Sequence, residues 1–445
     1  MITGTALLLV ILITLICIIL ACSVLKWHPF PVLLVMALVL GLLTGIPGNR
    51  VIKLVIDGGS SVFGGIGIII ALGSILGNIL EKTGAAISLA RGIIALTGKR
   101  KILPGMGILG AVIGIPVFCD SGFVILSNLT KTLALQTGLP AGSLSLALAS
   151  GLYTTHVLIP PTPGPLAAAG NLQMGEQLGW VILLGLLVSI PAIIIGVIQA
   201  AKYKINQQDR PSEEITVDER AAPSFINALI PLLLPVLLIA LGSLLPLLPI
   251  SAQAKEGIAF FCNPNIALLI AVILALVLLA RPAHKEWTGW IQHALMQAGP
   301  IILITIAGGS LGAVLKATAL SDFFEGMTNN PELPAMWLFP VSFLLAAGLK
   351  TSQGSSTAAM VIASSMIASL LPGAGMESPV QKALLVLCIG AGAMTVSHAN
   401  DSYFWVISQY AQIPPRDMFR HFSLSTFWMG LSVLLSSMLL AVILG

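Results

Sequence analysis

The chain is dominated by apolar runs that are long enough to cross a bilayer. A helix rises about 1.5 Å per residue, so about 20 residues span the hydrocarbon core. Runs of roughly this length alternate with short polar segments near residues 5–25, 30–47, 62–80, 140–158, 178–200, 225–248, 264–280, 296–315, 381–397 and 424–444. The pattern predicts an all-α polytopic membrane protein with two sets of five spans.

Between the third and fourth span of each set, two shorter apolar pieces replace the single long run. These pieces are 102–117 with 122–136, and 335–348 with 357–371. Polar residues and glycines separate the members of each pair. Non-helical backbone at membrane depth must be buried in protein or line an aqueous cavity, so we predict re-entrant helical hairpins at about 102–136 and about 335–371. Amphipathic pieces at 85–96 and 319–327 are expected to lie along the membrane interface.

The two halves resemble each other in sequence. A shift of 235 residues aligns 73–83 with 308–318, with identities at Gly73, Leu76, Gly77, Leu80 and Thr83, and it also places Asp120 on Ser355. A shift of 241 residues pairs Gly151 with Gly392. Five crossings per half leave the second half in the opposite orientation. We therefore predict inverted repeats, which are frequent in transporters.

Composition supports a membrane location. Hydrophobic residues make up 57% of the 445 residues and charged residues only 9%, too few to coat a soluble globule of this size. The net charge is +4, and no tract of Lys and Arg is dense enough for a nucleic acid. We expect a lipid bilayer and no nucleic-acid partner. The first apolar run lacks the features of a signal peptide and is expected to be retained.

Lys and Arg are distributed unevenly over the segments between the spans. With the N-terminus outside, fourteen of the 21 fall in cytoplasmic segments, five in outer segments and two within the hairpins. This bias agrees with the positive-inside rule. The polar stretch 202–224 is then a cytoplasmic linker between a first repeat, 1–201, and a second repeat, 225–445.

Four polar breaks supply the candidate binding residues: one in each hairpin, and one at the end of the fourth span of each half, near 154–164 and 397–402. In chain order these are Asp120, Ser121, Gly122, Thr155, His156, Gly354, Ser355, Ser356, Thr357, His398, Asn400 and Asp401. Broken helices in inverted-repeat transporters aim their positive N-terminal ends at an anionic substrate. Hydroxyls, amides and imidazoles beside such ends suit a small polyhydroxylated acid.

Several of these groups also have a structural explanation. The hydroxyls of residues 355–357 can bond back to helix carbonyls, His156 can be a buried core residue, and Asp401 can cap a helix that begins at Ser402. Lys350 either snorkels to the outer face or supplies positive charge to the site. Asp120 has no such alternative, because a carboxylate at membrane depth usually serves a cavity, a partner or a proton path.

A transporter needs an energy source. Asp120, with His156 as the second candidate, is predicted to carry a coupled proton, whereas Asp401 and Asn400 would suit sodium as the alternative. A channel or a binding-only protein is the next competing class. Cysteines lack metal-ligand spacing, and no G-x-S-x-G or H-E-x-x-H motif is present. We therefore expect no metal, no cofactor and no enzymatic activity.

At these same residues the sequence resembles the gluconate permease family of bacterial proton symporters. The similarity is strongest in G-I-P-V-F-C-D-S-G-F-V (114–124), T-H-V-L-I-P-P-T-P-G-P (155–165), G-S-S-T (354–357) and S-H-A-N-D-S-Y-F-W (397–405). It implies an inner-membrane importer of sugar acids such as gluconate, with glycerate or D-serine as alternatives, and a homodimeric elevator fold. The chain has Asp120, Thr162 and Lys350 where family members often have Glu, His and Arg.

Overall fold

The structure is a computed structural model that describes residues 4–23, 25, 27–98, 101–204, 223–245, 248–249, 251–318, 335–371, 374–399 and 401–444. All regular secondary structure in these ranges is helical. Asn400, the predicted interfacial piece 319–327 and most of the linker 202–224 lie outside the described residues. The described residues therefore include both helical halves and the segments that interrupt their helices.

The first half runs from α1 to α10. Its helices are α1 (Gly4–Ser23), α2 (Pro29–Leu43), α3 (Gly48–Val62), α4 (Ile68–Lys82), α5 (Ala85–Thr97), α6 (Ile102–Gly114), α7 (Cys119–Thr137), α8 (Ala141–Leu158), α9 (Pro163–Asn171) and α10 (Leu178–Ala200). A π-helical turn, Phe63–Gly67, joins α3 to α4 without a break.

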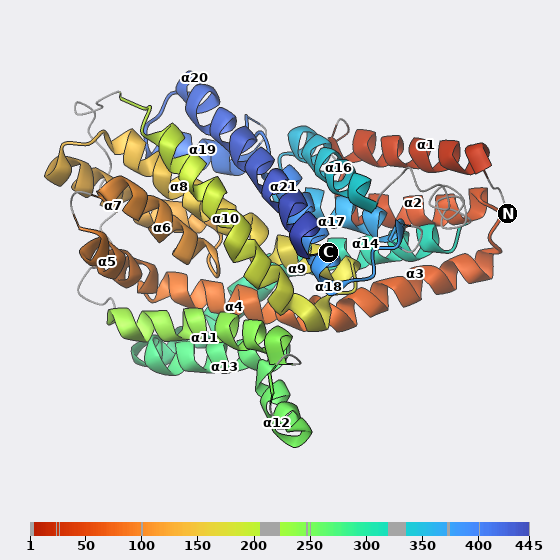
Figure 1. Cartoon of the computed structure of the whole chain (residues 1–445), viewed down its shortest axis with the longest axis horizontal. Coiled ribbons are helices and arrows are strands. Elements are labelled where there is room, and N and C mark those ends of the chain that lie inside the picture. Colours follow the sequence, from red (N-terminus) through yellow and green to blue (C-terminus); the bar gives the residue numbers. More distant parts are fainter. Residues whose placement is uncertain are drawn as a thin grey trace.

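The second half runs from α11 to α21. Its helices are α11 (Phe225–Leu244), α12 (Ala252–Cys262), α13 (Pro264–Leu278), α14 (Trp287–Lys316), α16 (Leu338–Gln353), α17 (Ser356–Ala368), α18 (Pro379–Met394), α19 (Ser402–Tyr410), α20 (Pro415–Met418) and α21 (Leu424–Leu444). In Figure 1, α9, α17 and α18 lie near the centre of the molecule, whereas α12 projects away from it.

Each expected span coincides with a helix of the structure. By length and apolar character, six segments of the described chain can cross a membrane: Gly48–Lys82, Ala141–Asn171, Gly175–Ala200, Phe225–Leu244, Ala283–Lys316 and Pro415–Leu444. The pair formed by α12 and α13, bent by 54°, makes a seventh if it is one span. The helices α2 and α18 are apolar but shorter. The chain is thus an all-helical, multi-pass membrane protein.

The third span differs most from its expected bounds. We expected it at 62–80, but the continuous helical segment begins at Gly48. The added part, α3, is amphipathic: Val51 and Val62 are buried, whereas Arg50 and Lys53 are exposed. Its buried face packs on α14, where Ser310 Oγ donates to the Val55 carbonyl at 2.7 Å. A search for apolar runs misses this helix because one face carries charge.

Both expected hairpins are helix pairs, but the first break lies three residues earlier than predicted and the second is shorter than predicted. Residues 115–118 separate α6 from α7, so Asp120, Ser121 and Gly122 lie in the first turn of α7 and not in the break. In the second pair α16 continues through Lys350 to Gln353. It ends at Gly354, whose φ of 82° is the left-handed conformation that glycine adopts readily.

The break of the first broken span is narrower than predicted, and that of the second begins two residues earlier than predicted. Residues 159–162 separate α8 from α9, and residues 395–401 separate α18 from α19. Pro163 opens α9, where its missing N–H costs no helical hydrogen bond. Asp401 caps α19 by accepting from the Tyr403 N–H at 3.1 Å. Each half therefore delivers two new helix N-termini to the interior of the protein.

Candidate functional site

One cavity of about 270 Å³ lies where these helix ends meet. It is lined by Phe118, Cys119, Asp120, Tyr153, His156, Gln353, Gly354, Ser355, Ser356, Thr357, Asp401, Ser402 and Tyr403. The N-termini of α7, α17 and α19 all contribute to this lining. A helix N-terminus carries partial positive charge and free N–H groups, so three of them around one cavity favour an anion.

An ion pair holds two of the breaks together beside the cavity. Lys350 is fully buried, and its Nζ lies 2.6 Å from Asp401 Oδ2. The same Nζ donates to the Gly354 carbonyl at 2.5 Å, and Ser397 Oγ donates to Asp401 Oδ2 at 2.5 Å. The Lys350 side chain therefore points inward and not to the outer face. It connects the turn of the second hairpin to the break before α19.

Asp401 is both a wall residue and a structural one. Its Oδ1 accepts from the Tyr403 N–H, and its Oδ2 accepts from Lys350 and Ser397. Both carboxylate oxygens are thus engaged by the protein. The negative charge of Asp401 is balanced by Lys350, so this pair adds little net charge to the cavity.

Asp120 is in the opposite situation. Its Oδ1 is buried without a hydrogen-bond partner among the described residues, as are His156 Nδ1 and Gln353 Nε2. The ring of His156 lies 5.7 Å from that of Phe118, which fixes the break before α7 against α8. Buried polar atoms are nearly always hydrogen-bonded. Three unpaired atoms around one cavity indicate that it accommodates a polar ligand.

Tyr153 connects the first half to the second at this cavity. Its hydroxyl lies 2.8 Å from Ser356 Oγ, and its ring lies 5.4 Å from that of Tyr403. Tyr403 in turn donates to the Ala149 carbonyl at 3.1 Å. Sequence reasoning missed Tyr153, Gln353 and Tyr403. The available signal for Tyr153 was its position three residues before His156, which puts both on one face of α8.

The cavity brings together Asp120, His156, Asp401 and the segment 354–357, whereas Ser121, Gly122, Thr155 and His398 are not part of its lining. Thr155 Oγ1 donates to the Ala111 carbonyl at 2.8 Å and so ties α8 to α6. Gly122 packs against Leu152, and Ser121 is absent from the lining. The His398 ring nitrogen Nε2 lies 3.0 Å from the Thr351 carbonyl, outside the cavity.

Within the part of the chain that the structure describes, no group of three or more His, Cys, Asp or Glu side chains is placed to hold a metal ion. The five cysteines are unpaired there, and Cys119 is the one that lines the cavity. The groups that line the cavity are helix N-termini, hydroxyls, an amide, an imidazole and the Asp120 carboxylate, which suit a polar ligand.

A polar cavity where broken helices meet inside an all-helical membrane protein defines a membrane transporter. The chain belongs to the GntP permease family, since the family model described as GntP family permease matches residues 6–443. It is 32% identical to the inner membrane permease YgbN of Escherichia coli K12, over 91% of this chain and 92% of that protein. It is 31% identical to a gluconate permease of Pseudomonas aeruginosa, over 92% of each.

The fold is also similar to a solved structure at low sequence identity. MtrF of Neisseria gonorrhoeae, described as one of a class of antimetabolite efflux pumps, matches with a TM-score of 0.67 and 13% identity, over 94% of this chain and 96% of that chain. At this identity the similarity concerns the fold alone. The resemblance to gluconate permeases found in the sequence is confirmed, and the relatives are permeases and not enzymes.

Proposed function

We propose that this protein is a secondary active importer of a small sugar-acid or hydroxy-acid anion, gluconate-like, coupled to proton symport. Glycerate and D-serine, which are smaller, are alternative substrates. The membership in a permease family supports transport of a small organic anion. The observation that carries the proposal is the free carboxylate of Asp120 in a cavity whose other charges are already paired.

The charges at the cavity link the anion to the proton. Lys350 and Asp401 neutralise each other, so an ionised Asp120 leaves the cavity with one net negative charge. A substrate carboxylate would add a second negative charge in a medium of low dielectric constant, where like charges repel strongly. Protonation of Asp120 removes this repulsion. The anion and the proton therefore enter most readily together, with His156 as a second proton-binding group.

The neutral groups of the cavity suit the rest of such a substrate. Hydroxyls of Ser355, Ser356 and Thr357 and the Gln353 amide can bond to substrate hydroxyls, while the helix N-termini hold the carboxylate. A volume of about 270 Å³ lies near the lower end of ligand pockets, which favours a small molecule. Gly122, Thr155 and His398 lie outside this lining and contact other parts of the protein by packing or by hydrogen bonds to backbone carbonyls.

The architecture that we propose consists of inverted repeats, 1–201 and 225–445, joined by a cytoplasmic linker at 202–224, with hairpin tips moving as in an elevator. The same order of hairpin and broken span in both halves supports it. An added Cβ on Gly151 would overlap the Gly107 carbonyl, and one on Gly392 would overlap the Phe343 carbonyl. The broken helix thus approaches the first hairpin helix closely in each half.

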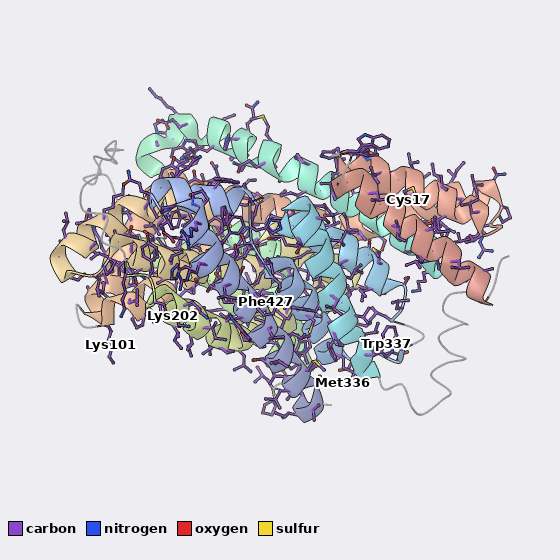
Figure 2. The ribbon with its side chains drawn as sticks, turned by 90° about the horizontal axis from the view of Figure 1, so that it is seen from above. Cys17, Lys101, Lys202, Met336, Trp337 and Phe427 are labelled. Atoms are coloured by element: carbon purple, nitrogen blue, oxygen red, sulfur yellow. The ribbon has the colours of Figure 1, made fainter. Side chains whose placement is uncertain are left out.

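Lysine placement supports the proposed orientation. Lys101 and Lys202, both assigned to the cytoplasm, lie toward one end of the view in Figure 2, and Trp337 lies toward the other end. A shared side for these two lysines agrees with the excess of basic residues that is typical of the cytoplasmic face. The permease relatives and the apolar helices support a location in the inner membrane, and a homodimer stays a prediction of the family resemblance.

Sodium coupling is the alternative to proton coupling. It has less support, because both oxygens of Asp401 accept hydrogen bonds from the protein and its charge is paired with Lys350. A sodium ion needs several free oxygen ligands, so it would have to displace these contacts. Asn400, the other residue considered for sodium, lies outside the described residues.

The decisive experiment uses right-side-out vesicles that contain the protein, with an imposed pH gradient and radiolabelled gluconate. We expect uphill uptake in sodium-free buffer that a protonophore dissipates. A panel that includes glycerate and D-serine then ranks the substrates by competition. Uptake that never exceeds equilibration would refute symport, and uptake that requires sodium would support the alternative.

A further inference from the structure

A second cavity, of about 530 Å³, lies at the other end of α17. Ser356 and Thr357, near the start of this helix, line the first cavity, whereas Ser365 and Ala368, near its end, line the second. Eight residues separate Thr357 from Ser365, which corresponds to roughly 12 Å along the helix axis. The remaining walls come from α3, α9, α14 and the segment before α18.

The charge of this second cavity is basic. Lys316, at the end of α14, and Lys382, in the first turn of α18, both line it, and Glu377 is the one acidic lining residue. Among the residues that the structure describes, neither lysine forms an ion pair. The cavity therefore presents two ammonium groups to whatever enters it.

Asn171 supplies an unused hydrogen-bond acceptor at the wall of the same cavity. Its side chain is 8% exposed, and its Nδ2 donates to the Val361 carbonyl at 3.1 Å and to Ser364 Oγ at 2.8 Å. These two bonds fix the orientation of the amide, since the nitrogen must face both acceptors. Its Oδ1 is buried and has no partner among the described residues. A buried acceptor of this kind is usually satisfied by a donor.

We propose that this cavity is a second binding site for the transported anion, in which Lys316 and Lys382 attract the carboxylate and Asn171 Oδ1 accepts a hydrogen bond from a substrate hydroxyl. The substrate class rests on the function proposed above. Both lysines belong to segments assigned to the outer face, so the site captures the anion before it reaches Asp120. Basic residues at such a mouth raise the local concentration of an anion and its rate of association.

Isothermal titration of the purified full-length protein with gluconate tests this site directly. We expect the wild type to bind two gluconates per chain, and the double variant Lys316→Gln with Lys382→Gln to bind one. The matched control removes the exposed lysines Lys204 and Lys285 by the same substitution and keeps both sites. In vesicles, the double variant should raise the KM for gluconate about tenfold, as expected for the loss of about 1.4 kcal/mol of binding, with Vmax unchanged.

A second variant tests the role of the hydroxyl. Asn171→Ala should weaken gluconate binding at the second site but leave hexanoate binding unchanged, because hexanoate has the carboxylate but no hydroxyl. Thermal unfolding of the variant separates this effect from a loss of packing at Val361 and Ser364. Equal weakening of both ligands in a stably folded variant would contradict the assignment of Asn171.

The outcomes separate this proposal from the proposed function. A wild type that binds one gluconate, with the same stoichiometry in the double lysine variant, overturns the second site and leaves symport intact. Two binding events without uphill uptake overturn symport and support the second site. If the wild type binds no gluconate at all, both proposals fall for this substrate.

Discussion

The turns of the two hairpins occupy matching places in the two halves, but they bring different charges to the same cavity. The first turn precedes Asp120, whose Oδ1 has no partner among the described residues. The second turn follows Lys350, which is bound to Asp401 and to the Gly354 carbonyl. One half therefore supplies a carboxylate with an unpartnered oxygen, and the other supplies a neutral, cross-linked wall.

Two hairpins that hold the same place in the order of helices therefore bring different side chains to one cavity. Both hairpins deliver a helix N-terminus, which is a property of backbone geometry and so survives divergence of the side chains. The charges are set by individual residues. Under the proposed function, protonation of Asp120 beside this neutral wall would make the binding of an anion depend on a proton. The predictions below test this division, from the largest expected effect to the smallest.

The buried pair in the second hairpin should carry the largest effect on stability. Lys350→Met leaves Asp401 buried without its counter-charge, which typically costs about 3–5 kcal/mol. The double variant with Asp401→Asn removes the stranded charge and should recover much of the loss. Thermal unfolding in detergent measures both. If the single and double variants unfold at the same temperature as the wild type, Lys350 and Asp401 do not form a buried ion pair.

The free carboxylate in the first hairpin should carry the coupling. Asp120→Asn should abolish accumulation driven by a pH gradient while leaving gluconate exchange, because the site no longer needs a proton to accept the anion. Uptake by the wild type should rise as the external pH falls, and uptake by the variant should not. Asp57→Asn, which removes an exposed carboxylate of α3, is the control. Accumulation at the wild-type level in the Asp120 variant would remove this residue from the coupling role.

The contact between the halves should have a smaller effect, on affinity. Tyr153→Phe removes the 2.8 Å hydrogen bond to Ser356 and a hydroxyl that lines the cavity. A single hydrogen bond contributes about 0.5–1.5 kcal/mol, so we expect the KM to rise by up to about tenfold. The concentration dependence of initial uptake rates measures this change. Tyr410→Phe, on the same helix as Tyr403 but outside the lining, should leave the KM unchanged.

The smallest effect on uptake is expected at one of the two histidines in the broken spans. His156 lines the cavity, whereas His398 lies outside it and contacts the Thr351 carbonyl. We expect His398→Ala to change uptake by less than about twofold, as for other partly exposed positions. His156→Ala should lower uptake clearly. Equal losses in the two variants, measured at matched expression, would mean that both halves contribute a histidine to transport.

The sequence alone determined the features that depend on local physics. Apolar runs and their interruptions are properties of neighbouring residues, because bilayer thickness sets the length of a span and Pro or Gly sets a break. We therefore predicted the helix pairs of the hairpins and the broken spans close to their positions in the structure. The amphipathic helix α3 was missed, because its buried face becomes apparent only when α14 covers it.

Tertiary structure decided which polar groups share one cavity and which are already paired. Lys350 and Asp401 are separated by 51 residues, and no periodicity along the chain links them. His156 and His398 have similar sequence surroundings, yet only the first lines the cavity. Burial, pairing and the unused oxygens of Asp120 and Asn171 arise from contacts between distant helices. These contacts join residues that are far apart in the sequence, so they can be identified only in the folded protein.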